Sequence, residues 1–507
     1  MSARRPLTLA EALLPVLTMF ALFTAGALTL GTSGELLVAV LLAAAAVAGA
    51  VAARHGHGWE EIQRATGEKL AGVLPALLIL LSIGLLIATW VLSGTIPYLV
   101  YWGVQLVSPR YLALTAFLAT ATMSLFTGTS WGSAGTIGVA LMGTAAALGA
   151  PLPLVAGAVV SGAYFGDKMS PLSDSTNIAA IGAGAELYAH IRHMVWTAGP
   201  SFVVALVAYA LLGGGAGAAA AGGIPEDARR LLDELEAVFT LNALVLIPAA
   251  IVVWSILRRV PAALAITASS VVALVMGVWL QGFAFGDAVT AAVAGFRADM
   301  IPGLDPGALG QDFLVLVERG GLYSMATTLI VVIAAFLLAG AMDAAGALDL
   351  LIGRMLAAVR SVFGLIAATM ASGATMIALT SHGGVTSLVI GGLFQKAYDE
   401  RGLARVNLSR SLEDSVTITE PLMPWTVSAV FIATTLGVPT TAYAPWAVFC
   451  YGGTCFSLLV AGAYRWTGRG VRAAGPGPPR SDAVRPGHVP PSLSGTDEVP
   501  GAPPPAR

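Results

Sequence analysis

The chain has 507 residues, of which 57% are hydrophobic and only 11% are charged, and its formal net charge is −2. Soluble globular domains carry about 25% charged residues, so this composition argues against a soluble protein and predicts a polytopic membrane protein. We expect an all-α fold whose partner is the lipid bilayer, and we expect no nucleic-acid ligand.

Eight charge-free apolar windows are long enough to hold a membrane-spanning helix, which needs about 20 apolar residues. In chain order they cover residues 12–31, 36–53, 71–93, 194–212, 238–257, 261–283, 322–342 and 442–464.

Four further apolar regions are interrupted by clusters of Gly, Ser, Thr and Pro. The clusters are "TGTSWGSAG" within 111–149, "GDKMSPLSDST" within 152–189, "TSHGG" within 361–395 and "SLEDSVTITEP" at the start of 411–436. Irregular backbone at membrane depth persists only where protein or a water-filled cavity satisfies its polar groups. We therefore predict re-entrant hairpins at 111–149 and 361–395, and broken helices at 152–189 and 411–436.

The distribution of Lys and Arg predicts the orientation, because cytoplasmic loops carry an excess of them. Arg4 and Arg5 place the N-terminus in the cytoplasm, and Arg465 and Arg469 place the end of the last span there. The first hairpin then enters from outside and the second from the cytoplasm. The Pro- and Gly-rich tail, 471–507, should be disordered and cytoplasmic. We expect a multi-pass protein of the cell (cytoplasmic) membrane with both termini inside.

The two halves of the chain match each other with inverted orientation. "ATMSLFTGTSWG" corresponds to "ATMIALTSHGG", "SDSTNI" to "EDSVTI" and "SPL" to "EPL". We predict an N-terminal repeat, 1–223, and a C-terminal repeat, 224–470, each with about five transmembrane helices, one of them broken, plus a re-entrant hairpin. Inverted repeats with paired broken helices indicate a secondary transporter whose site lies where the breaks meet near the midplane.

The candidate site residues lie on the two hairpin tips and in the two helix breaks. A charge retained at membrane depth is costly, so such a residue usually faces a cavity and has a function. The first half offers Thr127, Thr129, Ser130, Ser133, Asp167, Ser173, Asp174, Ser175, Thr176 and Asn177, and the second half offers Thr380, Ser381, His382, Asp414, Ser415, Thr417, Thr419 and Glu420.

Hydroxyl, amide, carbonyl and carboxylate oxygens are the ligands that a hard cation such as Na⁺ prefers. A carboxylate in such a site can hold either a cation or a proton, and competition between the two produces antiport. We predict that Asp174 and Asp414 are the Na⁺ ligands and proton carriers, and that Lys168 neutralises Asp167. No cofactor is expected beside the transported Na⁺ and H⁺.

Simpler roles for these residues remain open. Asp174 and Asp414 could be the N-caps of the half-helices that follow the breaks. Lys168 could instead bind an anionic substrate, helped by helix N-termini. His382 could be linked to proton transfer or could be a hydrogen-bonded residue of the hairpin tip.

"TGTSWGSAGTIGVALMG", followed by "SGAYFGDKMSPLSDSTNIAA", closely resembles the signature of the NhaC family of sodium/proton antiporters, within the ion transporter superfamily. The resemblance covers most of 70–465 in layout and is specific across 126–181. It implies Na⁺/H⁺ exchange by an elevator-like movement, with paired hairpins and broken helices around the ion. "LEDSVTITEPLMPW" is similar to the second-half motif of the family, which usually has a small residue in place of Glu420.

Three alternatives to a Na⁺/H⁺ antiporter are considered. A Na⁺- or H⁺-coupled carrier of a small organic acid or amino acid would keep the fold and change the cargo. An intramembrane hydrolase would use a buried serine and His382, but a single re-entrant loop would not explain the inverted repeat, so we expect no enzyme. A channel fits paired inverted tips less well than alternating access. A homodimer is compatible with the transporter interpretation.

Overall fold

A computed structural model describes residues 7–31, 33–213, 226–304, 307, 309–357 and 359–474. Every regular element in these ranges is a helix, apart from one isolated β-bridge between Leu403 and Ala473. Seven helices are long and apolar enough to cross a membrane, or up to ten if each bent pair is one span. This confirms the predicted all-α polytopic class. The part of the predicted disordered tail beyond residue 474 lies outside the described residues.

The first half contains the helices that carry the first hairpin and the first break. Its elements are α1 (Leu9–Leu30), α2 (Gly34–Arg54), α3 (Trp59–Leu92), α4 (Thr95–Leu106), α5 (Leu112–Thr127), α6 (Ser130–Ser133), a π-helical segment (Ala134–Gly138), α7 (Val139–Ala147), α8 (Leu152–Met169), α9 (Asp174–Ala183) and α10 (Leu187–Leu212).

The second half contains the other hairpin and the other break. Its elements are α11 (Glu226–Val238), α12 (Ile247–Leu257), α13 (Ala262–Trp279), α14 (Phe285–Ala294), α15 (Gln311–Val317), α16 (Ala326–Ala344), α17 (Ala347–Ala357), α18 (Val362–Thr380), α19 (Gly383–Glu400), α20 (Val406–Leu412), a π-helical segment (Glu413–Thr417), a 3-10 turn (Glu420–Leu422), α21 (Val427–Leu436), α22 (Thr440–Tyr443) and α23 (Val448–Thr467).

The two hairpin tips are built alike. Gly128 is the C-cap of α5 and Ser381 is the C-cap of α18, and both residues have left-handed backbone, with φ of 68° and 58°. This conformation reverses the chain, and it is uncommon for a residue with a side chain such as Ser381. The next residue of each tip, Thr129 or His382, then caps the returning helix through its side chain.

Both broken helices have their breaks in the polar clusters. α8 ends at Met169 and α9 begins at Asp174, with an irregular stretch between them. In the second half, the segment Val406–Leu422 bends by 46° against α21. The π-helical turn Glu413–Thr417 and the 3-10 turn after it replace regular α-helix there.

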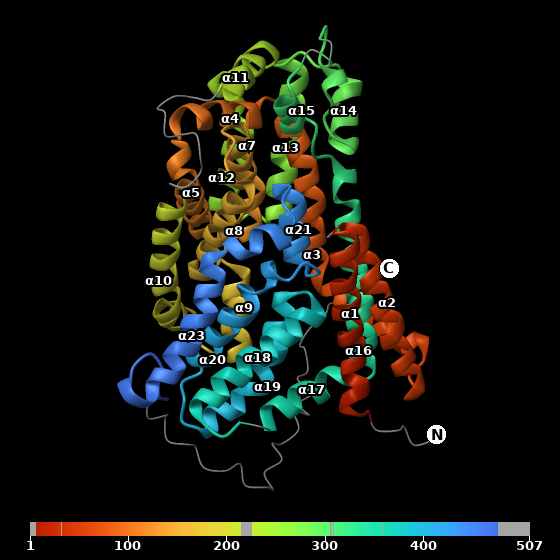
Figure 1. The fold of residues 1–507 in the computed structure, drawn as a ribbon, viewed down its shortest axis with the longest axis vertical. Coiled ribbons are helices and arrows are strands. Elements are labelled where there is room, and N and C mark those ends of the chain that lie inside the picture. Colours follow the sequence, from red (N-terminus) through yellow and green to blue (C-terminus); the bar gives the residue numbers. More distant parts are fainter. Residues whose placement is uncertain are drawn as a thin grey trace, which may run out of the picture.

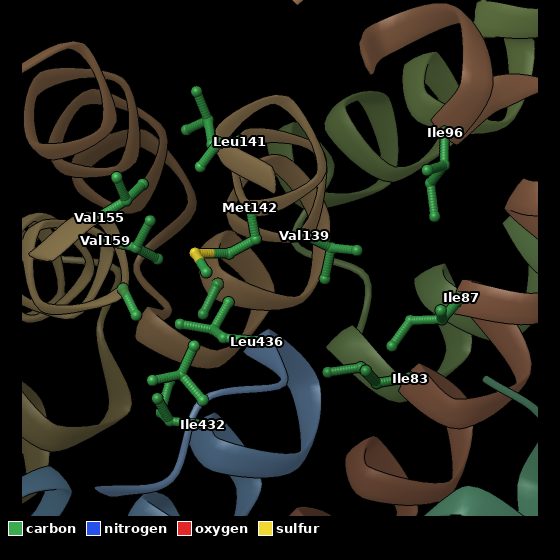
Figure 2. Packing of buried hydrophobic residues seen from close by; sticks show 14 of the residues in the cluster. Ile83, Ile87, Ile96, Val139, Leu141, Met142, Val155, Val159, Ile432 and Leu436 are labelled. Atoms are coloured by element: carbon green, nitrogen blue, oxygen red, sulfur yellow. The ribbon is translucent and has the colours of Figure 1, made fainter. Parts of the chain in front are cut away.

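The two halves are interlocked, because the second part of each broken helix packs on the hairpin of the other half. α9 lies against α19, and α21 lies against the returning limb of the first hairpin. Figure 2 shows Ile432 and Leu436 of α21 next to Met142 of α7 and Val159 of α8. Apolar burial of this kind stabilises the pairing without any polar contact with lipid.

The ends of the molecule carry different helices. Figure 1 shows α11, α14 and α15 at one end, and α17 and α19 toward the opposite end. The segments that the Lys/Arg pattern assigns to the outside and to the cytoplasm thus lie at opposite ends. Which end faces the cytoplasm remains a prediction.

The close approach of α9 to α19 gives a stability prediction. A Cβ added at Gly182 would lie 2.6 Å from the Ser387 carbonyl oxygen and 3.1 Å from Leu388 Cα, both in backbone that cannot easily move. Gly182→Ala should therefore lower the stability of the solubilised protein, by about 1–3 kcal/mol, as overpacked sites do. The measurement is the melting temperature in detergent.

The matched control is Gly67→Ala in α3, where an added Cβ would meet no heavy atom within 4 Å. This variant should melt no lower than the wild type, because alanine favours helix more than glycine does. Equal melting temperatures for Gly182→Ala and Gly67→Ala would contradict the prediction.

Candidate functional site

A cavity of about 270 Å³ lies where both hairpin tips and both helix breaks meet. The first half contributes Gly128 to Trp131, Tyr164, Asp167, Asp174, Ser175 and Ile178, and the second half contributes His382 to Gly384, Thr417, Glu420 and Ser428. The remaining wall comes from α3 at Gly72, Pro75, Ala76 and Ile79. Segments far apart in sequence therefore form one chamber, whose wall carries both apolar and acidic side chains.

About half of the sequence-predicted residues reach this chamber. Those lining it are Thr129, Ser130, Asp167, Asp174, Ser175, His382, Thr417 and Glu420. The cavity wall does not include Thr127, Ser133, Ser173, Thr176, Asn177, Thr380, Ser381, Asp414, Ser415 and Thr419.

Two predicted residues that do not line the cavity, Thr176 and Asn177, donate hydrogen bonds to backbone carbonyls at the first break. Thr176 Oγ1 donates to the carbonyls of Asp167 and Lys168, at 3.1 and 3.0 Å. Asn177 Nδ2 donates to the carbonyls of Pro171 and Ser173, at 3.0 and 2.7 Å. Carbonyls freed by a broken helix need such partners at membrane depth.

Asp167 is a carboxylate of the cavity wall whose position is fixed by two serine hydroxyl groups. It is 8% exposed, and it accepts hydrogen bonds from Ser130 Oγ at 2.7 Å and from Ser173 Oγ at 2.5 Å. The expectation that Lys168 neutralises Asp167 is wrong, because the Lys168 ammonium pairs with Asp414 instead. Two hydroxyl donors orient Asp167 without removing its charge, so its remaining acceptor capacity faces the cavity.

Glu420 is the second buried carboxylate on the wall, also 8% exposed, and it comes from the other half. Ser428, which starts α21 together with Val427, lines the cavity beside it and accepts a hydrogen bond from Trp131 Nε1 at 3.3 Å. The Tyr164 hydroxyl is buried on the same wall without a hydrogen-bond partner among the described residues. The sequence interpretation missed Tyr164, although it precedes Asp167 by three positions on one helix face.

Lys168 forms an ion pair with Asp414, and both side chains are fully buried. Asp414 Oδ1 also accepts from Thr197 Oγ1 at 3.1 Å, and its Oδ2 lies 3.9 Å from Arg410 Nε. The Asp414 carboxylate therefore interacts with Lys168, Thr197 and Arg410, and it does not line the cavity. Sequence reasoning did not find this pair because its members are 246 residues apart and belong to different halves.

Glu413 is the functional candidate that sequence reasoning passed over. It is fully buried, and neither carboxylate oxygen has a hydrogen-bond partner among the described residues. Lys168 and Asp167 lie close enough to interact with it electrostatically. The π-helical turn shifts the angular phase of side chains, so the choice between the adjacent Glu413 and Asp414 could not be made from an α-helical pattern.

Asp174 is exposed in the first turn of α9, at the cavity wall. The N-cap of α9 is Ser173, whose Oγ accepts from the Thr176 N–H at 3.4 Å, and Asp414 lies inside a π-helical turn. The capping alternative is thus wrong for both aspartates. Their predicted roles as ion carriers stay predictions.

His382 is a hydrogen-bonded tip residue. Its Nδ1 accepts from the Val385 N–H at 3.5 Å, which caps α19. Within the described ranges no serine hydroxyl is hydrogen-bonded to His382, so the nucleophile–base pair of a hydrolase is not assembled there.

The chemistry of the chamber suits a transported cation. Its wall carries three carboxylates, several hydroxyls and, among the described residues, no Lys or Arg. The described residues contain no group of three or more His, Cys, Asp or Glu that could hold a resident metal. Oxygen ligands without thiolates or imidazole clusters match a hard monovalent cation as cargo.

The Lys168–Asp414 pair gives a prediction on folding. Lys168→Met should destabilise the protein by about 3–5 kcal/mol, because it removes the nearer of the two buried cations beside the Asp414 carboxylate and leaves only Arg410, at 3.9 Å. Lys168→Met combined with Asp414→Asn should recover part of the lost stability, since the buried carboxylate is removed together with its cation, while the buried Arg410 then lacks the Asp414 charge. Melting temperature and monodisperse yield in detergent measure both variants. A single variant as stable as the wild type would rule out a tight pair.

Comparison with known proteins places this architecture in a family. Residues 162–463 match the model of the Na⁺/H⁺ antiporter family. A Haemophilus influenzae protein named as an uncharacterised Na⁺/H⁺ antiporter is 42% identical, over 90% of this chain and 96% of its own length. The Na⁺/H⁺ antiporter NhaC of Alkalihalophilus pseudofirmus is 35% identical over 79% of this chain and 85% of its own.

A third relative carries a different cargo in its name. The arginine/ornithine antiporter ArcD of Halobacterium salinarum is 32% identical, over 87% of this chain and 89% of its own length. The family match and the extent of these similarities confirm the resemblance seen in the signature motifs. The chain is a multi-pass membrane protein that belongs to the Na⁺/H⁺ antiporter family.

Proposed function

We propose that this protein exchanges Na⁺ for H⁺ across the cell membrane by an elevator-like, alternating-access mechanism, with both termini in the cytoplasm. Family membership supports the exchange of these ions. The observation that carries the proposal is the pair of buried carboxylates, Asp167 and Glu420, which reach one chamber from opposite halves of the chain.

The carboxylates provide a simple reason for coupled exchange. An ionised carboxylate in a largely buried chamber is stable only when a positive charge accompanies it. Na⁺ or a proton can supply that charge, but the two exclude each other at the same oxygens. Ser130 and Ser173 donate to Asp167 and leave its other lone pairs directed to the ion. Release of Na⁺ on one side therefore requires uptake of protons before the site can return.

Alternating access would move the interlocked unit against α3. Each broken helix packs on the opposite hairpin, so the two tips and two breaks move together. α3 supplies the one wall outside these motifs, through Gly72, Pro75, Ala76 and Ile79. Gly72 and Ala76 are small and Pro75 is rigid, so their side chains would offer little obstruction when the moving unit slides along α3.

A second candidate is a Na⁺- or H⁺-coupled carrier of a small organic solute. Anion binding was the alternative role considered for Lys168, but its side chain pairs with Asp414 and does not line the chamber. An acidic wall opposes an anionic substrate. It is compatible with a cationic amino acid, the type of substrate named for the haloarchaeal relative.

Transport in proteoliposomes tests the choice between these cargoes. With a pH gradient imposed across the membrane, added Na⁺ should dissipate it, because each Na⁺ moves against protons. K⁺ and choline at equal concentration serve as controls, and labelled arginine should not accumulate under the same gradient. A pH gradient unaffected by Na⁺ but dissipated by arginine would assign the second function.

Substitutions in the chamber test which carboxylates bind the ions. Asp167→Asn and Glu420→Gln should each lower Na⁺-dependent proton flux by more than about tenfold, as expected for loss of a ligand to the transported ion. Asp174→Asn, at the exposed part of the wall, should mainly raise the Na⁺ concentration for half-maximal flux. Flux is measured at several pH values, and lower pH should weaken apparent Na⁺ affinity because protons compete for the carboxylates.

All three variants keep side-chain volume, so insertion and monodispersity can be matched to the wild type before flux is compared. Wild-type flux in Asp167→Asn would remove Asp167 from the ion site. Complete loss in Asp174→Asn alone would instead support Asp174 as the carrier that the sequence first predicted.

A further inference from the structure

A second cavity, of about 270 Å³, lies near one end of α10, between this helix and the segment that follows α23. It shares no lining residue with the central chamber. Arg192 and Trp196 of α10 line it together with Arg472; both arginines are exposed, and Trp196 is 48% exposed. A ligand in this cavity would therefore meet two guanidinium groups and one indole ring.

The segment that contributes Arg472 is held in place by buried polar side chains of α20. Arg410 Nη1 donates to the Gly470 carbonyl, and Asn407 Nδ2 donates to the Arg472 carbonyl at 2.7 Å. Asn407 Oδ1 accepts from the Arg472 N–H at 2.9 Å and lies 3.0 Å from His193 Nε2 of α10. Because Asn407 and Arg410 are fully buried, these contacts fix the backbone of Arg472 beside α10.

Arg192 and Arg472 have no acidic partner among the described residues. No hydrogen bond or ion pair to either guanidinium is found there, and the described wall contains no Asp or Glu. Water can solvate both side chains, so burial alone does not demand a ligand. The two charges instead create a positive potential at one cavity, which attracts an anion. Arg465 and Arg469, both exposed near the end of α23, add to this potential.

The position of the cavity favours a lipid over a soluble anion. α10 is one of the helices long and apolar enough to cross a membrane. Three aromatic side chains near this end of α10 and α23 are exposed, namely Tyr188, Trp196 and Trp466. Trp and Tyr gather at the membrane–water interface. The two arginines of the cavity are therefore at the depth of phospholipid headgroups.

An apolar stripe leads from the cavity along α10. Trp196, Val203, Val207 and Leu211 recur at helical spacing on one face, and each is at least 48% exposed. This face is directed toward the lipid and away from the protein interior. The acyl chain of a lipid whose headgroup occupies the cavity would lie along it, whereas a soluble anion would gain nothing from the stripe.

We propose that this cavity binds the headgroup of an anionic phospholipid. Arg192 and Arg472 would donate to its phosphate oxygens, which match the planar donor geometry of guanidinium groups. Trp196 would lie beside the glycerol region. Basic pockets between membrane helices are suited to anionic headgroups for the same reason. The site is separate from the transported-ion chamber, and the inference does not depend on the proposed exchange.

Native mass spectrometry of the full-length protein in detergent tests the proposal. The probe is phosphatidylglycerol, and phosphatidylcholine with the same acyl chains is the zwitterionic reference. The wild type should bind the first phosphatidylglycerol at least fivefold more tightly than the reference. Arg192→Gln and Arg472→Gln should each weaken phosphatidylglycerol binding about fivefold, and the double variant about twentyfold, as expected for basic residues near an anionic headgroup. Phosphatidylcholine binding should not change.

Both arginines are exposed, so the variants should melt at the wild-type temperature before lipid is added. The matched control is Arg258→Gln, an exposed arginine at the end of α12 that lies over the Trp254 ring and does not line the cavity. It should bind phosphatidylglycerol as the wild type does. Equal affinity for the two lipids, undiminished binding in the double variant, or an equal loss in Arg258→Gln would overturn the proposal. Displacement by inorganic phosphate at constant ionic strength would also overturn it, because the cavity would then take a soluble anion.

Discussion

The structure depends on one constraint: two helices are interrupted at a depth where lipid provides no hydrogen-bonding partner for the freed backbone. At the first break, the carbonyls that α-helix would have satisfied accept from Thr176 and Asn177. At the second, Thr426 Oγ1 donates to the Glu420 carbonyl at 2.5 Å and Tyr443 Oη donates to the Pro421 carbonyl at 2.6 Å. Side chains from neighbouring elements thus replace water and make the breaks permanent features of the fold.

The buried ionisable side chains near the breaks also need partners, and they form two sets. Asp167 and Glu420 face the chamber, where a cation or proton can accompany them. Lys168 and Asp414 lie behind it and neutralise each other. A buried pair of this type contributes little net stability, but loss of one partner is expensive because the other charge cannot reach water. The pair joins α8 to the second broken helix, and so it ties the first half of the chain to the second.

Interlocking of the halves explains why the chamber contains residues from both. Gly182 and Gly391 allow α9 and α19 to approach until backbone meets backbone, with an added Cβ at Gly391 lying 2.5 Å from the Gly182 carbonyl. On the other side, Trp131 stacks on Phe431, with ring centroids 4.6 Å apart. Trp131 Nε1 also donates to Ser428 Oγ across the halves, so the first hairpin tip lies beside the break of the second half. Within each half, the tip approaches its own break, with Ser130 near Asp167 and Gly383 near Glu420.

The sequence by itself determined the membrane class, the four interrupted segments and the family, because apolar length, polar clusters and signature motifs are local properties of the chain. It also identified Asp167 and Glu420 as candidates. Only the tertiary structure decided which acids face the chamber. The partner of Lys168 is 246 residues away, and the phase shift of the π-helical turn at Glu413–Thr417 cannot be derived from regular periodicity. Pairing of buried charges is a property of the packed halves, because the Asp414 carboxylate is held by Lys168 and Thr197, which come from the other half of the chain.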